Sequence, residues 1–507
     1  MSNTEKFKLQ INEGYTCKGD FITLGGGILN GEAVADTHVN IPLKTLNRHG
    51  LIAGATGTGK TKTIQVLSEQ LSNKGIPVLM MDIKGDFSGI AMPGEEKSFI
   101  TERHQKINLP YQTQSFPVEL MTISEQNGVR LRATVSEFGP VLFSRILDLN
   151  DTQSGVVAII FKYCDDNNIP LLDLKDFKKV LQYATSEGKE EFEKEYGRVS
   201  TASTGSILRK VIELEQQGAE LFFGEKSFDI QDLMRINDEG KGYVNIIRLT
   251  DIQDRPKLFS TFMLCLLAEI YNSMPEQGDS GQPELVIFID EAHLIFNEAS
   301  KTLLDQIETI VKLIRSKGVG VYFITQNPMD VPSSVLAQLG LKIQHALRAF
   351  TANDRKAIKM TSENYPISEF YKTDEVLTSL GIGEAFVTAL NEKGIPTPLV
   401  ATMMRAPMSR MDVLTQKEIN ESISKSVLAK KYNEVIDRES AYEILTNKIN
   451  AIQQQVEKEQ ANKQASKENK KTSTSTSNTV TKSVVKVLTS ATFIRGAMGV
   501  LMRMMKK

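Results

Sequence analysis

Tryptophan is absent from this sequence, and cysteine and histidine are scarce, with three and five residues among 507. The cysteines, Cys17, Cys164 and Cys265, lie far apart, and no C-x-x-C pair occurs. An odd number of scattered thiols argues against a disulfide framework, and the spacing of these cysteines and histidines does not suit a zinc site. We therefore expect buried or idle thiols in a reducing cytosol.

Long apolar runs and an excess of one charge are also missing. No uninterrupted apolar segment reaches membrane-spanning length, and residues 1–10 lack the apolar stretch of a signal peptide. The 60 basic and 62 acidic residues give a formal net charge of −2, so nucleic acid would have to contact a local basic surface. These absences predict a soluble, cytoplasmic protein with no transmembrane segment.

The sequence does contain a phosphate-binding loop, Gly54-Ala-Thr-Gly-Thr-Gly-Lys-Thr61, which fits G-x-x-x-x-G-K-[ST]. The apolar residues 51–53 predict a strand before the loop, and residues 62–74 predict a helix after it. Backbone N–H groups and the helix N-terminus would surround the β-phosphate of ATP. Lys60 would contact the β- and γ-phosphate oxygens, and the Thr61 hydroxyl would hold Mg²⁺. The residues predicted to bind ATP are Gly54, Thr56, Gly57, Thr58, Gly59, Lys60, Thr61 and Lys62.

An acidic pair ends a hydrophobic run, Glu284-Leu-Val-Ile-Phe-Ile-Asp290-Glu291. In an open α/β sheet, a strand of this kind delivers its terminal side chains to the edge where ligands bind. We predict that Asp290 holds Mg²⁺ through water and that Glu291 polarises the water that attacks the γ-phosphate.

Two further polar residues flank the next apolar run, residues 318–325. The Gln326 amide, at its end, is placed to contact the γ-phosphate or the lytic water, although a capping amide is the alternative. Arg315 precedes the run, where it could stabilise the γ-phosphate of a neighbouring subunit or pair with a helix C-terminus. The segment Asp82-Ile-Lys84-Gly-Asp86 leaves a similar choice, between signalling from the nucleotide and a solvated loop.

Short Val/Ile-rich runs alternate with helical segments, which predicts an α/β fold with a mostly parallel sheet and right-handed crossovers. The predicted strands are residues 78–83, 243–249, 285–290, 319–325, 343–349 and 384–390. The predicted helices between them include residues 258–271 and 303–315. The predicted domains are a short N-terminal β-rich segment (1–46), an ATPase core (47–94 and 240–410) and a mostly helical insertion (95–239).

The C-terminal composition differs from that of the core. Residues 411–457 are highly charged with helical spacing, and residues 458–482 form a Lys/Gln/Ser/Thr tract that predicts a disordered linker. Residues 483–507 predict an amphipathic helix with basic residues and no acidic ones. Such a helix can lie on an anionic membrane, but an apolar stripe more often faces protein, which favours a neighbouring subunit.

Several motifs together resemble the HerA/FtsK group of P-loop ATPases, and within it the bacterial "helicase HerA-like C-terminal domain" (DUF853) family. They are the phosphate loop, Met81-Asp-Ile-Lys-Gly-Asp-Phe-Ser-Gly89, Ile289-Asp-Glu-Ala-His293, Ile324-Thr-Gln-Asn-Pro328, Arg132-Ala-Thr-Val-Ser-Glu-Phe-Gly-Pro140, Leu149-Asn-Asp-Thr-Gln153 and Gln344-His-Ala-Leu-Arg-Ala-Phe350. The resemblance implies a RecA-like core and an ATP-driven homo-oligomeric ring, usually a hexamer, that translocates double-stranded DNA. It also implies that Arg315 acts as an arginine finger in trans. Too few residues precede Gly54 for the N-terminal β-barrel of HerA, so pairing with a nuclease is not implied.

Two functions are compatible with these residues. The first is a DNA-translocating ring ATPase. The second is an NTP-gated scaffold or switch that binds protein partners through its insertion or its C-terminal helix, without DNA translocation. The intact acidic pair indicates real hydrolysis and favours the motor.

Overall fold

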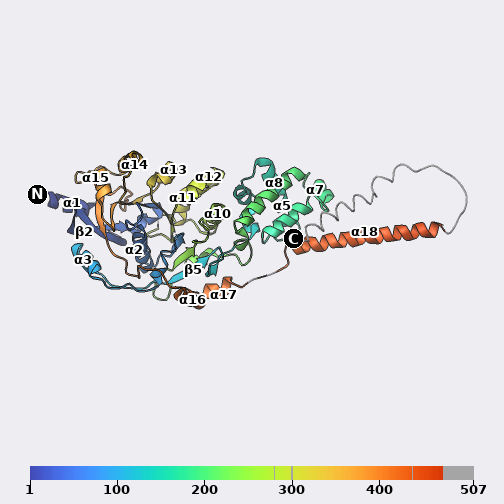
Figure 1. The fold of residues 1–507 in the computed structure, drawn as a ribbon, viewed down its shortest axis with the longest axis horizontal. Coiled ribbons are helices and arrows are strands. Elements are labelled where there is room, and N and C mark those ends of the chain that lie inside the picture. Colours follow the sequence, from blue (N-terminus) through green and yellow to red (C-terminus); the bar gives the residue numbers. More distant parts are fainter. Residues whose placement is uncertain (279, 299–300, 435, 437, 472–507) are drawn as a thin grey trace. The chain divides into compact units, whose positions relative to one another are not determined.

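In the computed structural model the chain is described over residues 1–278, 280–298, 301–434, 436 and 438–471. The described residues fall into two units, one of residues 1–445 and one that begins at residue 446. The first unit is built around one twelve-stranded sheet with helices packed on it (Figure 1). The strands, in spatial order, are β2 (Glu32–Pro42), β1 (Phe21–Leu29), β12 (Val400–Met404), β11 (Glu384–Thr388), β10 (Leu341–His345), β3 (Gly50–Ala53), β9 (Val319–Thr325), β8 (Leu285–Ile289), β4 (Val78–Asp82), β7 (Val244–Arg248), β5 (Val118–Thr122) and β6 (Val129–Arg130).

The sheet changes direction at β10. From β10 to β6 every neighbouring pair is parallel, whereas from β2 to β10 every pair is antiparallel. The predicted α/β fold with a mostly parallel sheet is therefore confirmed. The strand predicted at 384–390 is present as β11, but it runs antiparallel to both neighbours.

The central strands are buried on both faces. Every residue of β3, β4, β8 and β9 is buried, which explains their unbroken apolar sequences. Long helices cover them, and the predicted helix 258–271 is part of α10, whose apolar side chains are almost all buried. The helices of the ATPase core are α2 (Lys60–Asn73), α3 (Ser98–Lys106), α9 (Ile230–Leu233), α10 (Pro256–Ser273), α11 (His293–Glu298), α12 (Lys301–Ile314), α13 (Ser333–Leu336), α14 (Ala352–Glu363) and α15 (Thr373–Ser379).

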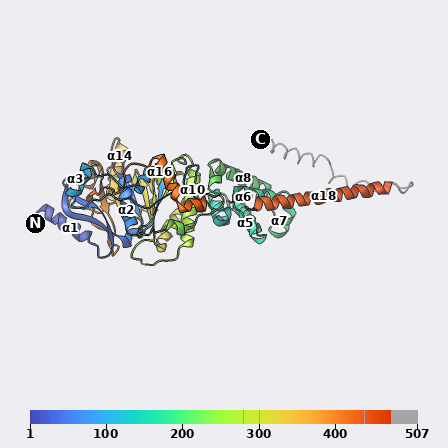
Figure 2. The same cartoon turned by 90° about the horizontal axis from the view of Figure 1, so that it is seen from below.

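The interval 95–239 contributes to the sheet before its main helices begin. The strand β5 pairs with β7 along its whole length, so part of this interval extends the ATPase core. The remaining helices gather beside the sheet in both views, around a small aromatic core in which the Phe143 and Phe177 rings are 4.8 Å apart (Figures 1 and 2). They are α4 (Val135–Ile146), α5 (Asp151–Asp166), α6 (Leu174–Tyr183), α7 (Lys189–Glu195) and α8 (Thr201–Gln216). The boundaries of the insertion stay a prediction.

Both chain ends differ from the sequence-based expectation. The N-terminal segment begins with a helix that was not predicted, α1 (Asn3–Gly14), which starts at a capping box formed by Ser2 and Glu5. After β12 come α16 (Gln416–Lys425), α17 (Val427–Tyr432) and α18 (Ala441–Lys471). Residues 458–471, predicted as disordered linker, are helical instead, because Lys, Gln, Ala and Glu are strong helix formers. The rest of that linker and the predicted basic helix 483–507 lie outside the described residues.

Within the described part of the chain, no helix combines the length and the apolar character that a membrane crossing requires.

Candidate nucleotide site

The phosphate loop connects β3 to α2 and is anchored to both neighbouring strands. The Gly54 amide donates to the Thr325 carbonyl at 3.3 Å, and the Ala55 amide donates to the Ala346 carbonyl at 2.9 Å. Gly54 has a φ of 151°, and a Cβ there would lie 2.5 Å from the His345 Cβ, so only glycine fits. The loop is therefore held in a fixed shape at the carboxyl edge of the sheet.

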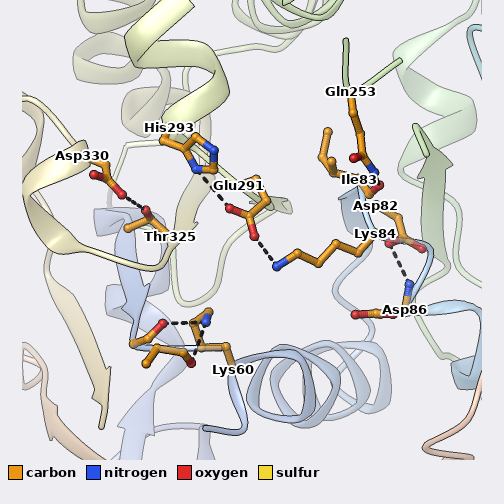
Figure 3. A network of polar contacts seen from close by, with 12 residues as sticks. Lys60, Asp82, Ile83, Lys84, Asp86, Gln253, Glu291, His293, Thr325 and Asp330 are labelled. Atoms are coloured by element: carbon orange, nitrogen blue, oxygen red, sulfur yellow. Dashed lines mark hydrogen bonds and ion pairs between the residues drawn. The ribbon is translucent and has the colours of Figure 1, made fainter. Parts of the chain in front are cut away.

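Lys60 is the buried cation of this loop. Its Nζ donates to the Gly54 carbonyl at 2.6 Å and to the Ala55 carbonyl at 3.1 Å, and only 8% of the residue is exposed (Figure 3). Burial lowers the pKa of Lys60, and the nearby charge of Lys84 lowers it further. An ammonium held against the loop backbone is placed to meet a phosphate that enters the loop.

The acidic pair follows β8 at the same edge of the sheet. Glu291 is 5% exposed and has a φ of 48°, a left-handed conformation that costs a residue with a side chain about 1 kcal/mol. One of its oxygens forms an ion pair with Lys84, and His293 Nδ1 lies 3.0 Å from the other (Figure 3). The predicted water-activating carboxylate thus lies between two basic side chains.

The loop that carries Lys84 is anchored by hydrogen bonds, although Lys84 itself is exposed. The buried Asp82 carboxylate accepts from the amides of Gly85 at 2.7 Å and Asp86 at 3.0 Å, and Gln253 Nε2 donates to the Ile83 carbonyl at 2.8 Å (Figure 3). Burial lowers the pKa of Lys84, but the contact with Glu291 and the charge of Asp290 outweigh it, so the pKa is raised. Lys84 contacts the acidic site and is also exposed, so both interpretations of this segment, signalling from the nucleotide and a solvated loop, stay predictions.

The residues predicted to hold Mg²⁺ suit this ion. Asp290 is 6% exposed at the end of β8, and its charge and that of Glu291 both act on Lys60. Thr61 is half-buried at the start of α2. Within the described residues no three His, Cys, Asp or Glu side chains cluster as a metal cage. Mg²⁺ bound with a nucleotide needs no such cage, since one or two protein oxygens, waters and phosphates complete its shell.

Lys62 and two neighbours on α2 bind another part of the chain, residues 408–411, which we call the strap. Lys62 Nζ donates to the Met411 carbonyl, and Gln65 Nε2 donates to Ser409 Oγ at 2.6 Å. The buried Glu69 carboxylate accepts from the two backbone amides at positions 408 and 409 at 2.8 and 2.9 Å. The Lys62 side chain is therefore engaged by the strap, and its part in nucleotide binding stays a prediction.

Comparison with known proteins decides the family. The family model "Helicase HerA-like C-terminal" matches residues 28–506. This chain belongs to that family. The HerA-like core is the α/β core described above, and as a member of this family the chain is a P-loop ATPase.

Individual relatives of this HerA-like chain are distant. It is 24% identical over 386 residues to the DNA double-strand break repair helicase HerA of Sulfolobus acidocaldarius, covering 75% of this chain and 69% of that protein. It is 26% identical over 358 residues to the helicase of the same name from Sulfurisphaera tokodaii, covering 70% and 64%. The chain thus spans about two thirds of the length of these relatives.

A solved structure shows the same fold. The plasmid coupling protein TrwB, in complex with the ATP analogue ADPNP, matches with a TM-score of 0.52 at 15% identity, over 82% of this chain and 96% of that one. At this identity the likeness concerns the fold alone, and it confirms the predicted RecA-like P-loop architecture.

The HerA-like sheet separates the two remaining predicted residues. Gln326 is exposed at the carboxyl end of β9, the edge that carries Lys60 and Asp290. Arg315 is exposed in the short 3-10 helix that precedes β9, at the opposite edge. The seven residues of β9 span on the order of 20 Å, so Arg315 does not reach the phosphate loop of its own chain.

His345, at the end of β10, was not singled out from the sequence. Its Nδ1 donates to the Glu384 carbonyl at 3.0 Å, so its Nε2 accepts from the Thr63 hydroxyl of α2, also at 3.0 Å. The ring thereby fixes α2 against β10 and β11. It lies within residues 344–350, a stretch that supports the family resemblance, but only its long-range contacts show what its side chain does.

Replacing His345 by Asn should change how stability depends on pH. Burial lowers the pKa of His345 to about 4, below the ordinary value of 6.5. As the pH drops, this imidazole therefore binds its proton at a higher pH in the unfolded chain than in the folded one. Wild-type stability consequently falls as the pH drops from 6.5 towards 4. The stability advantage of wild type over His345→Asn should shrink by about 2 kcal/mol between neutral pH and about pH 5. Urea unfolding at both pH values measures this, and a constant difference would contradict a neutral buried imidazole.

Proposed function

We propose that this chain is the subunit of an ATP-hydrolysing ring motor, most simply a homohexamer, that translocates on double-stranded DNA. The observation that carries the proposal is the assembly of Lys60, Lys84, Asp290 and Glu291 at one edge of the sheet, with the charges of the acidic pair acting on both lysines. A phosphate cradle with a buried acidic pair beside it suits hydrolysis rather than storage of a nucleotide.

Each residue has a definite part in the reaction. The loop amides and Lys60 would bind the β- and γ-phosphates. Thr61, and Asp290 through water, would hold Mg²⁺, which would neutralise charge on those phosphates. Glu291 orients and polarises the attacking water, and the Gln326 amide contacts the γ-phosphate or that water. Before Glu291 accepts a hydrogen bond from water, its contact with Lys84 has to loosen. The ion pair with Lys84 therefore slows hydrolysis.

The position of Arg315 supports the proposed ring. A positive charge that stabilises the transition state has to approach the γ-phosphate, and Arg315 lies at the wrong edge of its own sheet to do so. A second copy in a closed, head-to-tail arrangement supplies the missing charge to each site. We infer that every active site lies between two subunits.

DNA is proposed as the substrate because of the activities for which the relatives are named. Both HerA proteins are named as double-strand break repair helicases, and a relative from Sulfolobus acidocaldarius, 24% identical over 396 residues, is named as the DNA import protein CedB. Handling DNA is the activity that these names share. The family model that matches this chain, over residues 28–506, spans its phosphate loop and its acidic pair.

The test is ATP hydrolysis with and without linear duplex DNA, at low and moderate salt, with Glu291→Gln as the inactive background. We expect DNA to raise the rate several-fold, with less stimulation at higher salt because phosphate contacts release counterions. Mass photometry with and without nucleotide measures the mass of the assembly and so shows whether the ring forms. Robust hydrolysis in a ring that neither binds DNA nor responds to it would overturn the translocase and favour the protein-directed switch.

A further inference from the structure

A small cavity lies between the sheet and the two neighbouring helices α13 and α14 (Figure 1). Its volume is about 190 Å³, and Lys342 of β10 and Leu51 of β3, which are partners in the strand register, both line it. Side chains alternate along a strand, and His345 of β10 contacts α2, so Lys342 faces the other side of the sheet. Apolar walls come from Pro328, Leu336, Ala337 and Tyr365.

Lys342 brings a positive charge to this cavity without a matching acid. The side chain is half-buried, and among the described residues no carboxylate forms an ion pair with it. Its Nζ lies 3.5 Å from the Asn364 carbonyl, which is longer than the roughly 3 Å of an ordinary N–H···O bond. Burial lowers the pKa of Lys342. An ammonium that has lost part of its water and has no counter-charge is costly, so an anion in the cavity would be stabilised.

A second polar residue of the lining, Thr361 of α14, points independently to a ligand. It is 1% exposed, and within the part of the chain that the structure describes its hydroxyl has no hydrogen-bond partner. Other polar groups of the lining do have partners. The Tyr365 hydroxyl donates to Gln344 at 3.3 Å, and the Asn364 amide donates to a carbonyl of α14 at 3.2 Å. Buried hydroxyls are normally paired, so Thr361 has a donor that the fold does not use.

The size and the walls of the cavity select among anions. Pockets for nucleotides and drug-sized molecules have volumes of about 300 Å³ or more, so this cavity suits a smaller molecule. Inorganic phosphate has more acceptor oxygens than the cavity has free donors, and it has nothing to place against the apolar walls. A carboxylate has two oxygens, one for an ammonium and one for a hydroxyl, and a short hydrocarbon or aromatic body suits the walls.

We propose that this cavity binds a small organic carboxylate, whose oxygens meet Lys342 and Thr361 and whose apolar body packs against the walls. The ligand is distinct from the nucleotide, and the inference depends neither on the ring nor on DNA. The cavity is nevertheless close in the chain to the nucleotide site. Leu51 belongs to the strand that leads into the phosphate loop, and Pro328 follows Gln326 by two residues.

The test uses benzoate and hexanoate as probes, with benzamide and hexanamide as their neutral counterparts, on the full chain. Saturation-transfer NMR and calorimetry should show that at least one acid binds at one site per chain, and that its amide binds roughly tenfold more weakly or worse. Lys342→Met should weaken binding of that acid by roughly tenfold or more, and Thr361→Val should weaken it several-fold. Lys359→Met, at an exposed lysine of α14, is the matched control and should bind as wild type.

Three results would overturn the inference. Neither acid binds the wild type at millimolar concentration, or the amide binds as well as its acid, or both variants bind as the wild type does. In the first case, a lower melting temperature of Lys342→Met would leave Lys342 only as a cation at the end of α14.

Thr361→Val keeps the test valid if Lys342→Met fails to fold. The substitution keeps the shape of the side chain and removes a hydroxyl that has no partner, so it should not lower the melting temperature. A fall in benzoate or hexanoate affinity in this folded variant therefore reports the site. None of these measurements involves ATP or assembly, so their failure would leave the proposed function untouched.

Discussion

Glu291→Gln is expected to lower the rate of ATP hydrolysis by about 100-fold to 1000-fold while leaving ATP binding intact. The amide has the volume of the carboxylate but cannot take part in polarising water as a base. Glu291 is buried at the end of β8, and Lys84 and His293 hold it in place, so the loss arises at the reacting water rather than in the fold. Phosphate release and binding of a fluorescent nucleotide measure the two quantities separately.

A control distinguishes the carboxylate from the ion pair that it forms. Lys84→Met breaks the same contact but keeps the carboxylate, and it should retain nucleotide binding and far more hydrolysis than Glu291→Gln. An equal loss in both variants would show that the ion pair, and not the base, is what hydrolysis requires. Near wild-type turnover of Glu291→Gln would remove Glu291 from the proposed mechanism.

Arg315→Ala should reduce hydrolysis by about 1000-fold without weakening nucleotide binding. The reason is geometric, because Arg315 is exposed at the edge of the sheet opposite its own phosphate loop and is placed to act only on a neighbour. Lys317→Ala is the matched control, since Lys317 lies in the same turn but is paired with Glu276 at 3.1 Å. It should lose little activity.

The measurement combines hydrolysis rate, nucleotide affinity and assembly state. An arginine acting in trans affects the rate alone, provided that the ring still forms. A loss of nucleotide affinity in monomeric Arg315→Ala would indicate a role within the chain, and wild-type turnover would make the residue an ordinary helix-terminal cation.

The sequence was most informative where function needs a local pattern. The loop around Lys60 and the acids after β8 could be predicted because glycine spacing and an apolar strand ending in Asp-Glu are visible in a few residues. Most strand and helix positions were predicted for the same reason, and β9 matches residue for residue. The strand predicted at 343–349 is instead β10, Leu341–His345. The parallel sheet then places these ends together without further information.

What could not be predicted depends on contacts between distant segments. The ion pair of Lys84 with Glu291 joins positions more than two hundred residues apart, and nothing near Lys84 in the sequence indicates its partner. His345 has the same difficulty, since burial and hydrogen bonding define it rather than a motif. The antiparallel direction of β11 depends on its connection to β10 and not on its composition.

The strap connects the helix that follows the phosphate loop to a distant part of the chain. Three side chains of α2 bind residues 408–411, namely Lys62, Gln65 and Glu69. A rotation of α2 about its axis would therefore displace the strap or break these bonds. Arg410 extends the linkage, because its guanidinium contacts the Glu418 carboxylate of α16 at 2.9 and 2.8 Å. These bonds connect the helix that holds the phosphates to α16, more than three hundred residues further along the chain, so we expect a rotation of α2 to displace α16.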